Sequence, residues 1–349
     1  MMDKTIDLRS DTVTKPTARM REAMMNAEVG DDCYGEDPTI HRLEALAAEK
    51  VGKAAAMYVP TGTMGNTAAI LTHTRVGDYA IMDAECHIYY YEHGNVSSLA
   101  GIMPIVMNSA DGVPALDEVE AYLQRDPAKF PKVSLICLEN THNRRGGRAI
   151  PLDRMGAVHE LAQRYGVPVH LDGARIFNAA QALGVDVSEV ASRVDSVMFC
   201  LSKGLCAPVG SMLAGDADFI QEARRARKRL GGAMRQSGVL AAAGIVALTE
   251  MPDRLGEDHA NAKLLAKALS QFDELALQSE DVDSNMVFVN TKPLGISAAD
   301  FADRALQHNI KVSVYGPMTV RMVANHDASR EDVLYAAETL VDLIKSLGS

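Results

Sequence analysis

Strand-like apolar runs alternate with helix-like stretches between about residues 54 and 201 of this 349-residue chain. This alternation predicts an α/β fold in which helices connect the strands of a mostly parallel sheet. Residues 210–214 form a further run only six residues after Gly204, too soon for a helical crossover, so that strand is predicted to run antiparallel to its predecessor. The other runs lie at residues 54–59, 79–82, 133–138, 167–171 and 197–201.

A second pattern begins after Met251-Pro252-Asp253, which ends an Ala-rich helical stretch at 239–249. A long helix over about 256–272 leads to strand-like segments at 286–290, 311–314 and 319–324. Helices are expected to begin at Ser297 and Ser329, because each serine has an aspartate three residues later, as in a capping box. We therefore predict a larger domain over residues 1–255 and a smaller C-terminal α+β domain over 256–349.

The charge and cysteine content of the chain restrict its partners. A net charge of −11 argues against binding to nucleic acid or to an acidic membrane. The basic cluster at 224–229 is interpreted as the C-terminal end of a helix, where cations complement the helix dipole. Five cysteines without Cys-x-x-Cys spacing favour a reducing cytoplasm and no metal site. The polar N-terminus and the lack of a long apolar segment predict neither a targeting signal nor a membrane span.

Reactive side chains follow several of the predicted strands. Asp172 comes directly after one apolar run and Lys203 shortly after the next. The carboxyl ends of parallel strands meet at one edge of a sheet, so this aspartate and this lysine are expected in one cleft. Pyridoxal phosphate uses both groups, since a lysine forms a Schiff base with its aldehyde and a carboxylate keeps its ring nitrogen protonated. The structural alternatives are a solvated lysine and an aspartate that caps the next helix.

Three further features fit an anionic ligand at the same edge. Thr61-Gly62-Thr63-Met64-Gly65-Asn66 follows a strand and begins a helix, whose free backbone N–H groups attract a phosphate. His87 and His142 also follow strand ends. Arg321 lies within an apolar strand, where burial of an unpaired guanidinium is costly, so we expect a structural carboxylate or a substrate carboxylate beside it.

The motifs closely resemble those of the pyridoxal-phosphate-dependent L-threonine aldolases of low specificity. The resemblance covers most of the chain and implies fold type I, with a mostly parallel, seven-stranded mixed sheet. Two departures are Ala233, where a third glycine is common, and Thr61, where serine is common. The matching segments are IDLRSDTVT (6–14), GDDCYGEDPT (30–39), GTMGN (62–66), ENTHN (139–143), HLDGAR (170–175), SKG (202–204) and MRQ (234–236).

The resemblance also implies a role for each site residue. Lys203 would form the Schiff base, Asp172 would pair with the pyridine nitrogen, and His87 would stack on the ring. Gly62 and Thr63 would hold the phosphate. Arg175 would lie near the ring oxygen or the substrate carboxylate, and Ser10 and Arg321 would bind that carboxylate. His142 would reach the β-hydroxyl together with His87. The resemblance also implies a homotetramer built from dimers, in which Tyr34 and Arg235 reach a neighbouring subunit's site.

The implied activity is retro-aldol cleavage of L-threonine, L-allo-threonine and related β-hydroxy-α-amino acids to glycine and an aldehyde. A β-eliminating lyase and an aminotransferase remain alternatives, because they use the same cofactor and a fold does not choose among them. A non-catalytic binding or regulatory protein on this scaffold is a further alternative. The preference among L-threonine, L-allo-threonine and phenylserine, and the identity of the base at the β-hydroxyl, stay open at this point.

Overall fold

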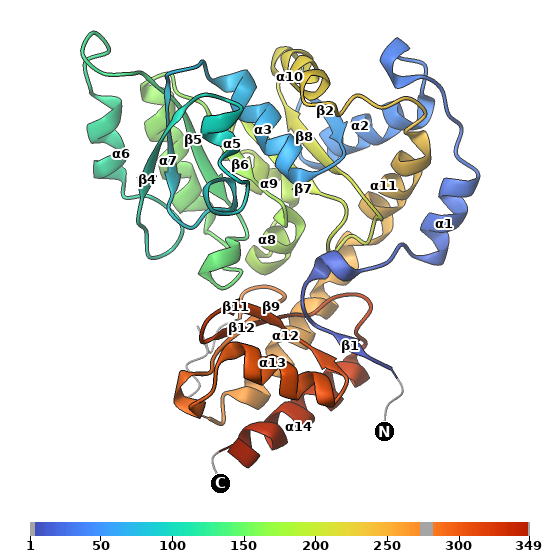
Figure 1. Ribbon diagram of the computed structural model, residues 1–349. Helices are drawn as coiled ribbons and strands as arrows, with labels where there is room; N and C mark the ends of the chain where they lie inside the picture. Colours follow the sequence, from blue (N-terminus) through green and yellow to red (C-terminus); the bar gives the residue numbers. More distant parts are fainter. Residues whose placement is uncertain (1–3, 273–281, 348–349) are drawn as a thin grey trace. The chain divides into compact units, whose positions relative to one another are not determined.

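The structure, a computed structural model, describes residues 4–272 and 282–347 and divides into two compact units (Figure 1). The larger unit is Pro16–Pro252, and the smaller one combines Met1–Lys15 with Asp253–Ser349. The N-terminal segment therefore groups with the smaller unit, whereas the sequence placed it in the larger domain. The cause is long-range pairing, because β1 (Ile6–Asp7) lies parallel to β10 (Ile310–Lys311) and Val323 donates its N–H to Leu8 O at 2.7 Å.

The larger unit is organised around a sheet of seven strands within its described residues, in the order β2-β8-β7-β6-β5-β3-β4. Only β8 runs against the others, since both its neighbours pair with it antiparallel, which confirms the predicted direction of that strand. The strands are β2 (Ala55–Val59), β3 (Tyr79–Asp83), β4 (Met103–Met107), β5 (Val133–Glu139), β6 (Val169–Asp172), β7 (Ser196–Cys200) and β8 (Ser211–Gly215).

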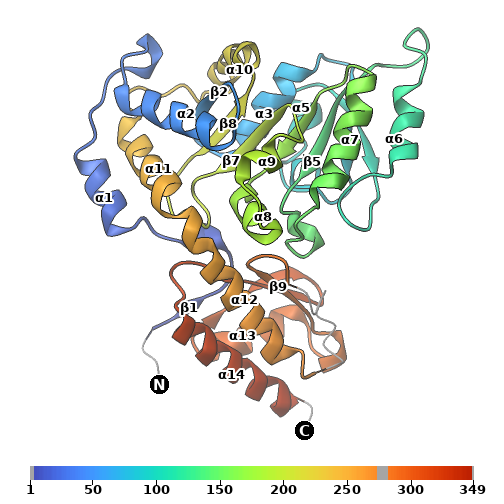
Figure 2. The same ribbon diagram turned by 180° about the vertical axis from the view of Figure 1, so that it is seen from behind.

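Helices cover both faces of this sheet, as an α/β fold requires. On one face, α3, α5 and α10 bury apolar side chains against the strands (Figure 1), and α7 lies on the opposite face (Figure 2). All residues of β5 and β7 are buried, as expected for central strands with cover on both sides. The helices are α1 (Ala18–Met25), α2 (Pro38–Lys50), α3 (Gly62–His73), α4 (His87–Tyr90), α5 (Asn95–Ser98), α6 (Leu116–Leu123), α7 (Leu152–Arg164), α8 (Ile176–Leu183), α9 (Val187–Ala191), α10 (Ala217–Arg229) and α11 (Gly238–Glu250), with short 3-10 turns at Asp32–Tyr34 and Asn143–Arg145.

Strand β4 is the element of the large sheet that the sequence did not predict. It contains Pro104, which cannot donate a hydrogen bond to a neighbouring strand, and proline normally argues against a strand. The structure places β4 at the edge of the sheet, where it pairs only with β3 within the described residues. An edge strand tolerates proline, so the residue that argued against a strand in the sequence is accommodated here.

The smaller unit contains a three-stranded antiparallel sheet in the order β11-β12-β9. The capping boxes at Ser297 and Ser329 are confirmed, because each serine bonds the backbone N–H of the aspartate three residues later. The predicted strand at 311–314 is divided between β10 and β11. The remaining elements are η1 (Asp11–Val13), η4 (Pro252–Arg254), α12 (Leu255–Leu269), β9 (Met286–Asn290), η5 (Lys292–Leu294), α13 (Ala298–Gln307), β11 (Ser313–Gly316), β12 (Thr319–Val323) and α14 (Arg330–Leu347). In the described residues, we find no helix with the length and apolarity needed to cross a membrane.

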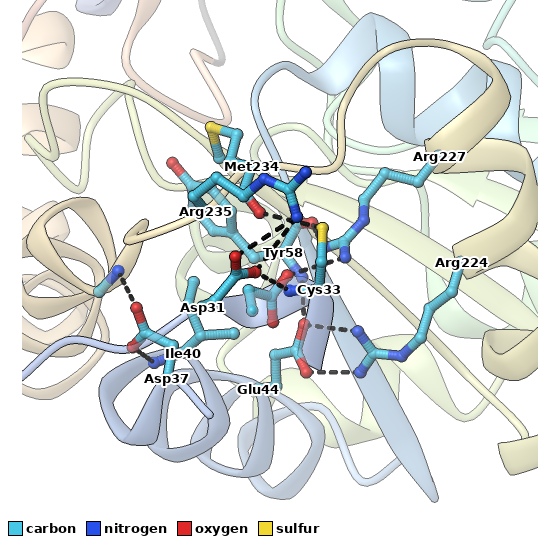
Figure 3. Close-up of polar contacts among 12 residues, drawn as sticks. Asp31, Cys33, Asp37, Ile40, Glu44, Tyr58, Arg224, Arg227, Met234 and Arg235 are labelled. Atoms are coloured by element: carbon cyan, nitrogen blue, oxygen red, sulfur yellow. Dashed lines mark hydrogen bonds and ion pairs between the residues drawn. The ribbon is translucent and has the colours of Figure 1, made fainter. Parts of the chain in front are cut away.

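Asp37 joins two helices of the larger unit (Figure 3). Its side chain is fully buried, and one oxygen accepts hydrogen bonds from the N–H groups of Thr39 and Ile40 at the start of α2. The other oxygen accepts the N–H of Gly238, the first residue of α11, at 2.8 Å. A Cβ on Gly238 would lie 2.4 Å from this carboxylate, so the contact requires glycine.

We expect Asp37→Ala to lower the free energy of unfolding by about 2–4 kcal/mol, because it removes a helix cap and leaves a buried N–H group of α11 unpaired. Urea denaturation measures the loss. Asp186→Ala is the matched control, since Asp186 caps α9 at an exposed position, and its loss should cost only about 1 kcal/mol. Equal losses in the two variants would contradict the bridging role of Asp37.

Candidate functional site

The carboxyl ends of four neighbouring parallel strands form one edge of the large sheet. Asp83, Glu139, Asp172 and Cys200 are the last residues of β3, β5, β6 and β7. Backbone hydrogen bonds continue past the strand ends, from Asn140 N to Asp172 O at 3.0 Å and from the residue after Asp172 to Met198 O at 2.8 Å. The structure therefore brings the predicted strand ends together.

The start of α3 packs against this edge. Gly62 and Gly65 allow the close approach, because a Cβ on Gly65 would lie 2.6 Å from Cγ of Met198, and one on Gly62 would lie 3.1 Å from Sγ of Cys200. Thr61 caps the helix by accepting the N–H of Met64 at 3.1 Å. The helix N-terminus is thus held beside the ends of β6 and β7, where its N–H groups can bind an anion.

Asp172 is buried, and both its oxygens accept hydrogen bonds. Oδ1 accepts the N–H of Ala174 at 3.0 Å, which is the local capping contact considered from the sequence. Oδ2 accepts Nδ2 of Asn66, on α3, at 2.9 Å. Asp172 therefore orders its own turn with one oxygen and joins the sheet to α3 with the other.

His87 begins α4 and lies beside Asp172. Its backbone N–H donates to Glu139, and its Nδ1 lies 3.0 Å from Oε1 of Glu92 and 4.0 Å from Oδ2 of Asp172. Burial opposes a charged imidazole, but the hydrogen bond to Glu92 and the charges of Asp172, Glu92 and Glu139 outweigh it and raise the pKa of His87. The ring also lies 5.3 Å from that of Tyr91.

Glu92 is a member of this cluster that the sequence analysis missed. It is 2% exposed, and burial raises the pKa of its carboxyl group. The residue lies in Tyr91-Glu92-His93, between two short helices, without a motif or a strand end to mark it. Only its position five residues after His87 hinted at a contact, and that spacing alone is weak.

His142 occupies a separate position at the end of β5. Its side chain is fully buried, and Nε2 lies 3.3 Å from Oδ1 of Asp83. Burial opposes protonation, but the charges of Glu139 and Asp83 raise the pKa of His142 against a smaller opposing effect of Arg145. Asp83 is buried as well, yet the nearby ring of His142 and hydrogen bonds from Ser109 and the backbone N–H of Glu85 lower its pKa to about 2. The structure therefore pairs His142 with a carboxylate, as it does His87.

Lys203 lies in the turn between β7 and β8. Backbone bonds from Leu201 N to Gly210 O and from Ala207 N to Leu201 O, each 3.0 Å, close this turn, and Cys206 N donates to Lys203 O at 2.8 Å. Lys203 is half-buried, and the three residues after it are buried. Arg175, just before α8, is also buried. The residues that follow Lys203 are buried as expected, and its role as the cofactor lysine stays a prediction.

The segment that carries Tyr34 contacts the one that carries Arg235, and Figure 3 shows Asp31 and Cys33 beside Met234 and Arg235. Tyr34 is 79% exposed. Arg235 forms an ion pair with Asp31 at 3.4 Å, and its carbonyl accepts the N–H of Asp32 at 3.3 Å. Asp32 in turn pairs with Arg227 of α10 at 2.9 Å. Arg227 thus fixes this loop, and the basic cluster lies at the C-terminal end of α10, as the sequence predicted.

Ser10 and Arg321 belong to the smaller unit. Arg321 donates from Nη2 to the carbonyl oxygen of Arg9 at 3.1 Å, and its guanidinium lies 4.9 Å from the ring centre of Tyr315. The hydroxyl of Ser10 accepts the N–H of Thr12 at 3.2 Å. The smaller unit therefore brings Arg321 to the residue that precedes Ser10.

We expect Asp83→Asn to destabilise the protein more at about pH 5.5 than at about pH 8.5, because Asp83 stabilises only the protonated form of His142. The raised pKa of His142 stabilises the folded state below its ordinary value of 6.5, and this contribution is lost as the pH rises through the folded-state value. The loss of unfolding free energy in Asp83→Asn, measured by urea titration, should be about 1 kcal/mol larger at the lower pH.

Asp111→Asn is the control for this pH dependence. Asp111 forms an ion pair with Arg154 at 2.9 Å, and an arginine, unlike a histidine, does not change its charge between these pH values. Asp111→Asn should therefore lower the free energy of unfolding by the same amount at both pH values. If the loss in Asp83→Asn were also independent of pH, the pairing of Asp83 with a titrating His142 would be wrong.

Comparisons with known proteins identify the family and the fold of the chain. A sequence model of the beta-eliminating lyase family matches residues 7–292. The chain is 45% identical over 341 residues to low-specificity L-threonine aldolase 1 of Arabidopsis thaliana, covering 96% of this chain and 95% of the relative. It is 42% identical over 333 residues to the low specificity L-threonine aldolase of Escherichia coli (strain K12), covering 95% and 97%. The solved threonine aldolase of Leishmania major matches with a TM-score of 0.82 at 18% identity, over 97% of this chain and 99% of that chain, which confirms the expected fold. The chain therefore belongs to the beta-eliminating lyase family, together with the low-specificity L-threonine aldolases that its motifs resemble.

Proposed function

We propose that this protein is a pyridoxal-phosphate-dependent aldolase of low specificity. It cleaves L-threonine, L-allo-threonine and other β-hydroxy-α-amino acids to glycine and an aldehyde. The observation that carries the proposal is a buried carboxylate, Asp172, at the end of β6, beside the N-terminus of α3 and next to the strand that leads to Lys203. The 45% and 42% identities over nearly the whole chain favour the aldolase reaction within the family.

The residues at this edge fit pyridoxal phosphate. Asp172 offers a buried anion for a protonated pyridine nitrogen, and its Oδ2 accepts a hydrogen bond from the neutral amide of Asn66. The N-terminus of α3, with Gly62 and Thr63, offers N–H groups to the phosphate. Lys203 supplies the amine that binds the aldehyde. When bound, the cofactor withdraws electrons from the bond that is cleaved.

The side chains of this chain provide the other steps. Lys203 would hold the cofactor through its amine before and after each turnover. Asp172 keeps the ring nitrogen protonated. His87, His142 or a water molecule held by them would take the proton of the β-hydroxyl. The raised pKa values of both rings suit them to hold a proton until Cα of the product is protonated. Arg175 is proposed near the ring oxygen or the substrate carboxylate. The assignments of Ser10 and Arg321 to the carboxylate stay predictions.

We place the enzyme in the cytoplasm as a homotetramer, a dimer of dimers whose sites are shared across the dimer interface. Tyr34 and Arg235 would serve the neighbouring subunit's site, Arg235 at the cofactor and Tyr34 at the substrate. The exposure of Tyr34 and the anchoring of its loop by the Arg227–Asp32 ion pair support this assignment, because a side chain that works on a partner must project from a fixed base.

The test supplies the purified, cofactor-loaded protein with L-allo-threonine and L-threonine separately. Acetaldehyde is followed with a coupled alcohol dehydrogenase, and glycine is quantified. Equal amounts of both products are expected, and the ratio of the two rates gives the specificity. Release of an oxo acid and ammonia instead would replace cleavage by β-elimination, and an aminated cofactor would indicate transamination.

Lys203→Ala should lose both turnover and the absorbance of the lysine-bound cofactor, because no other group can form that bond in the proposed site. Lys129→Ala is the matched control, since the Lys129 side chain is 75% exposed and pairs only weakly with Asp126 at 3.6 Å. It should keep both signals. Normal turnover in Lys203→Ala would show that the lysine assignment is wrong.

A further inference from the structure

One amide group joins the two buried carboxylates of the site. Nδ2 of Asn66 lies 2.8 Å from Oε1 of Glu92 and 2.9 Å from Oδ2 of Asp172. An NH2 group has two hydrogens, so Asn66 can donate one to each carboxylate. Asn66 is itself fully buried, and the amide cannot exchange this pair of acceptors for water.

The orientation of this amide is fixed by a chain of hydrogen bonds behind it. Oδ1 of Asn66 only accepts, so Nε2 of His170, at 3.1 Å, must donate. Burial lowers the pKa of His170 to about 3, so the ring is neutral and its Nδ1 accepts from the hydroxyl of Ser196 at 2.9 Å. Ser196 in turn accepts from Nε2 of His73 at 2.8 Å. Each donor in the chain therefore points towards the two carboxylates.

His87 faces the same two carboxylates through one atom. Its Nδ1, an oxygen of Glu92 and an oxygen of Asp172 all lie within 4.8 Å of one another. Both neighbours of Nδ1 are acceptors, so Nδ1 carries the hydrogen and the ring gains or loses its other proton at Nε2. Glu92 is the direct partner at 3.0 Å, whereas Asp172 is 4.0 Å away.

This difference in distance has a consequence for Asp172. Without Glu92, Nδ1 of His87 would have Asp172 as its nearest anion and could compete with another donor for Oδ2. Oε1 of Glu92 accepts the hydrogen bond from Nδ1 of His87. Oε2 of Glu92 has no hydrogen-bond partner among the described residues. A buried carboxylate oxygen without a partner is costly, so packing alone gives no reason for a glutamate here.

We propose that Glu92 is a positioning residue: it fixes the tautomer and the orientation of His87 and keeps that ring from binding Asp172, which stays available to the cofactor. The inference rests on the proposed function, because Asp172 needs to be available only if a cofactor binds there. Glu92 acts through His87 and Asn66 and does not itself touch the substrate.

The test compares Glu92→Gln with the unchanged protein. Glutamine keeps the shape of Glu92 but removes its charge, so it is a weaker acceptor for Nδ1 of His87 and leaves Asp172 as the nearest anion of that ring. In ¹³C-histidine-labelled protein, NMR should show that the pKa of His87 falls by about 1, because Asp172 and Glu139 remain as its only anionic neighbours. In the cofactor-loaded enzyme, kcat should fall about 10-fold or more with a smaller change in KM, and the acid limb of the pH profile should move in the same direction.

Two further variants separate positioning from a merely structural role. Glu44→Gln also removes a buried carboxylate charge of the larger unit, one that pairs with Arg224 and accepts the N–H of Tyr58 (Figure 3). It should lower stability without moving the pKa of His87 or the pH profile. In a His87→Asn background, Glu92→Gln should cost little further activity, because the residue through which it acts is already gone.

The outcomes also separate this inference from the proposed function. The NMR titration is made on the protein both as purified and after loading with pyridoxal phosphate, so it does not depend on turnover. A lowered pKa of His87 in a protein that cleaves neither threonine isomer would support the pairing and refute the aldolase. Active enzyme in which Glu92→Gln leaves the pKa of His87 and the pH profile unchanged would overturn the role of Glu92.

Discussion

Two buried carboxylates at one sheet edge, Asp172 and Glu92, impose the arrangement around them. Burial of an anion is costly unless donors surround it, and the donors here come from separate parts of the larger unit. Asn66 must reach across from α3, and α3 can approach only because Gly65 leaves room for Met198. The close packing of helix on sheet is therefore a condition for the site as much as for the core.

The four histidines of this region show how position sets the charge of one side-chain type. His170 is buried and His73 is half-buried, and neither hydrogen-bonds to a carboxylate among the described residues, so burial dominates and lowers the pKa of His73 to about 4 and that of His170 to about 3. His142 is also buried and His87 is half-buried, but each lies beside a carboxylate, and their pKa values are raised. A neutral ring donates at one nitrogen and accepts at the other, so it fixes the direction of a chain of hydrogen bonds. A ring beside a carboxylate can hold and release a proton.

Much of this edge could be predicted from local sequence, and the rest depends on pairing between distant segments. Asp172 and Lys203 were located because each follows an apolar run, which is a property of a few consecutive residues. Glu92 gave no such signal, since its partners come from α3 and α4 and only the folded chain unites them. The sequence placed residues 1–15 in the larger domain, whereas the structure groups them with the smaller unit, because β1 pairs with a strand about 300 residues away.

The pairing of β2 with β8 has a consequence for biosynthesis. Val59 lies opposite Ser211 in the finished sheet, so β2 leaves the ribosome long before its only partner strand within the described residues exists. Until then its apolar residues are exposed to other chains, and contacts between such distant segments form slowly. The first strand of the large sheet therefore cannot pair until the chain has grown by about 150 residues, from Val59 to Ser211.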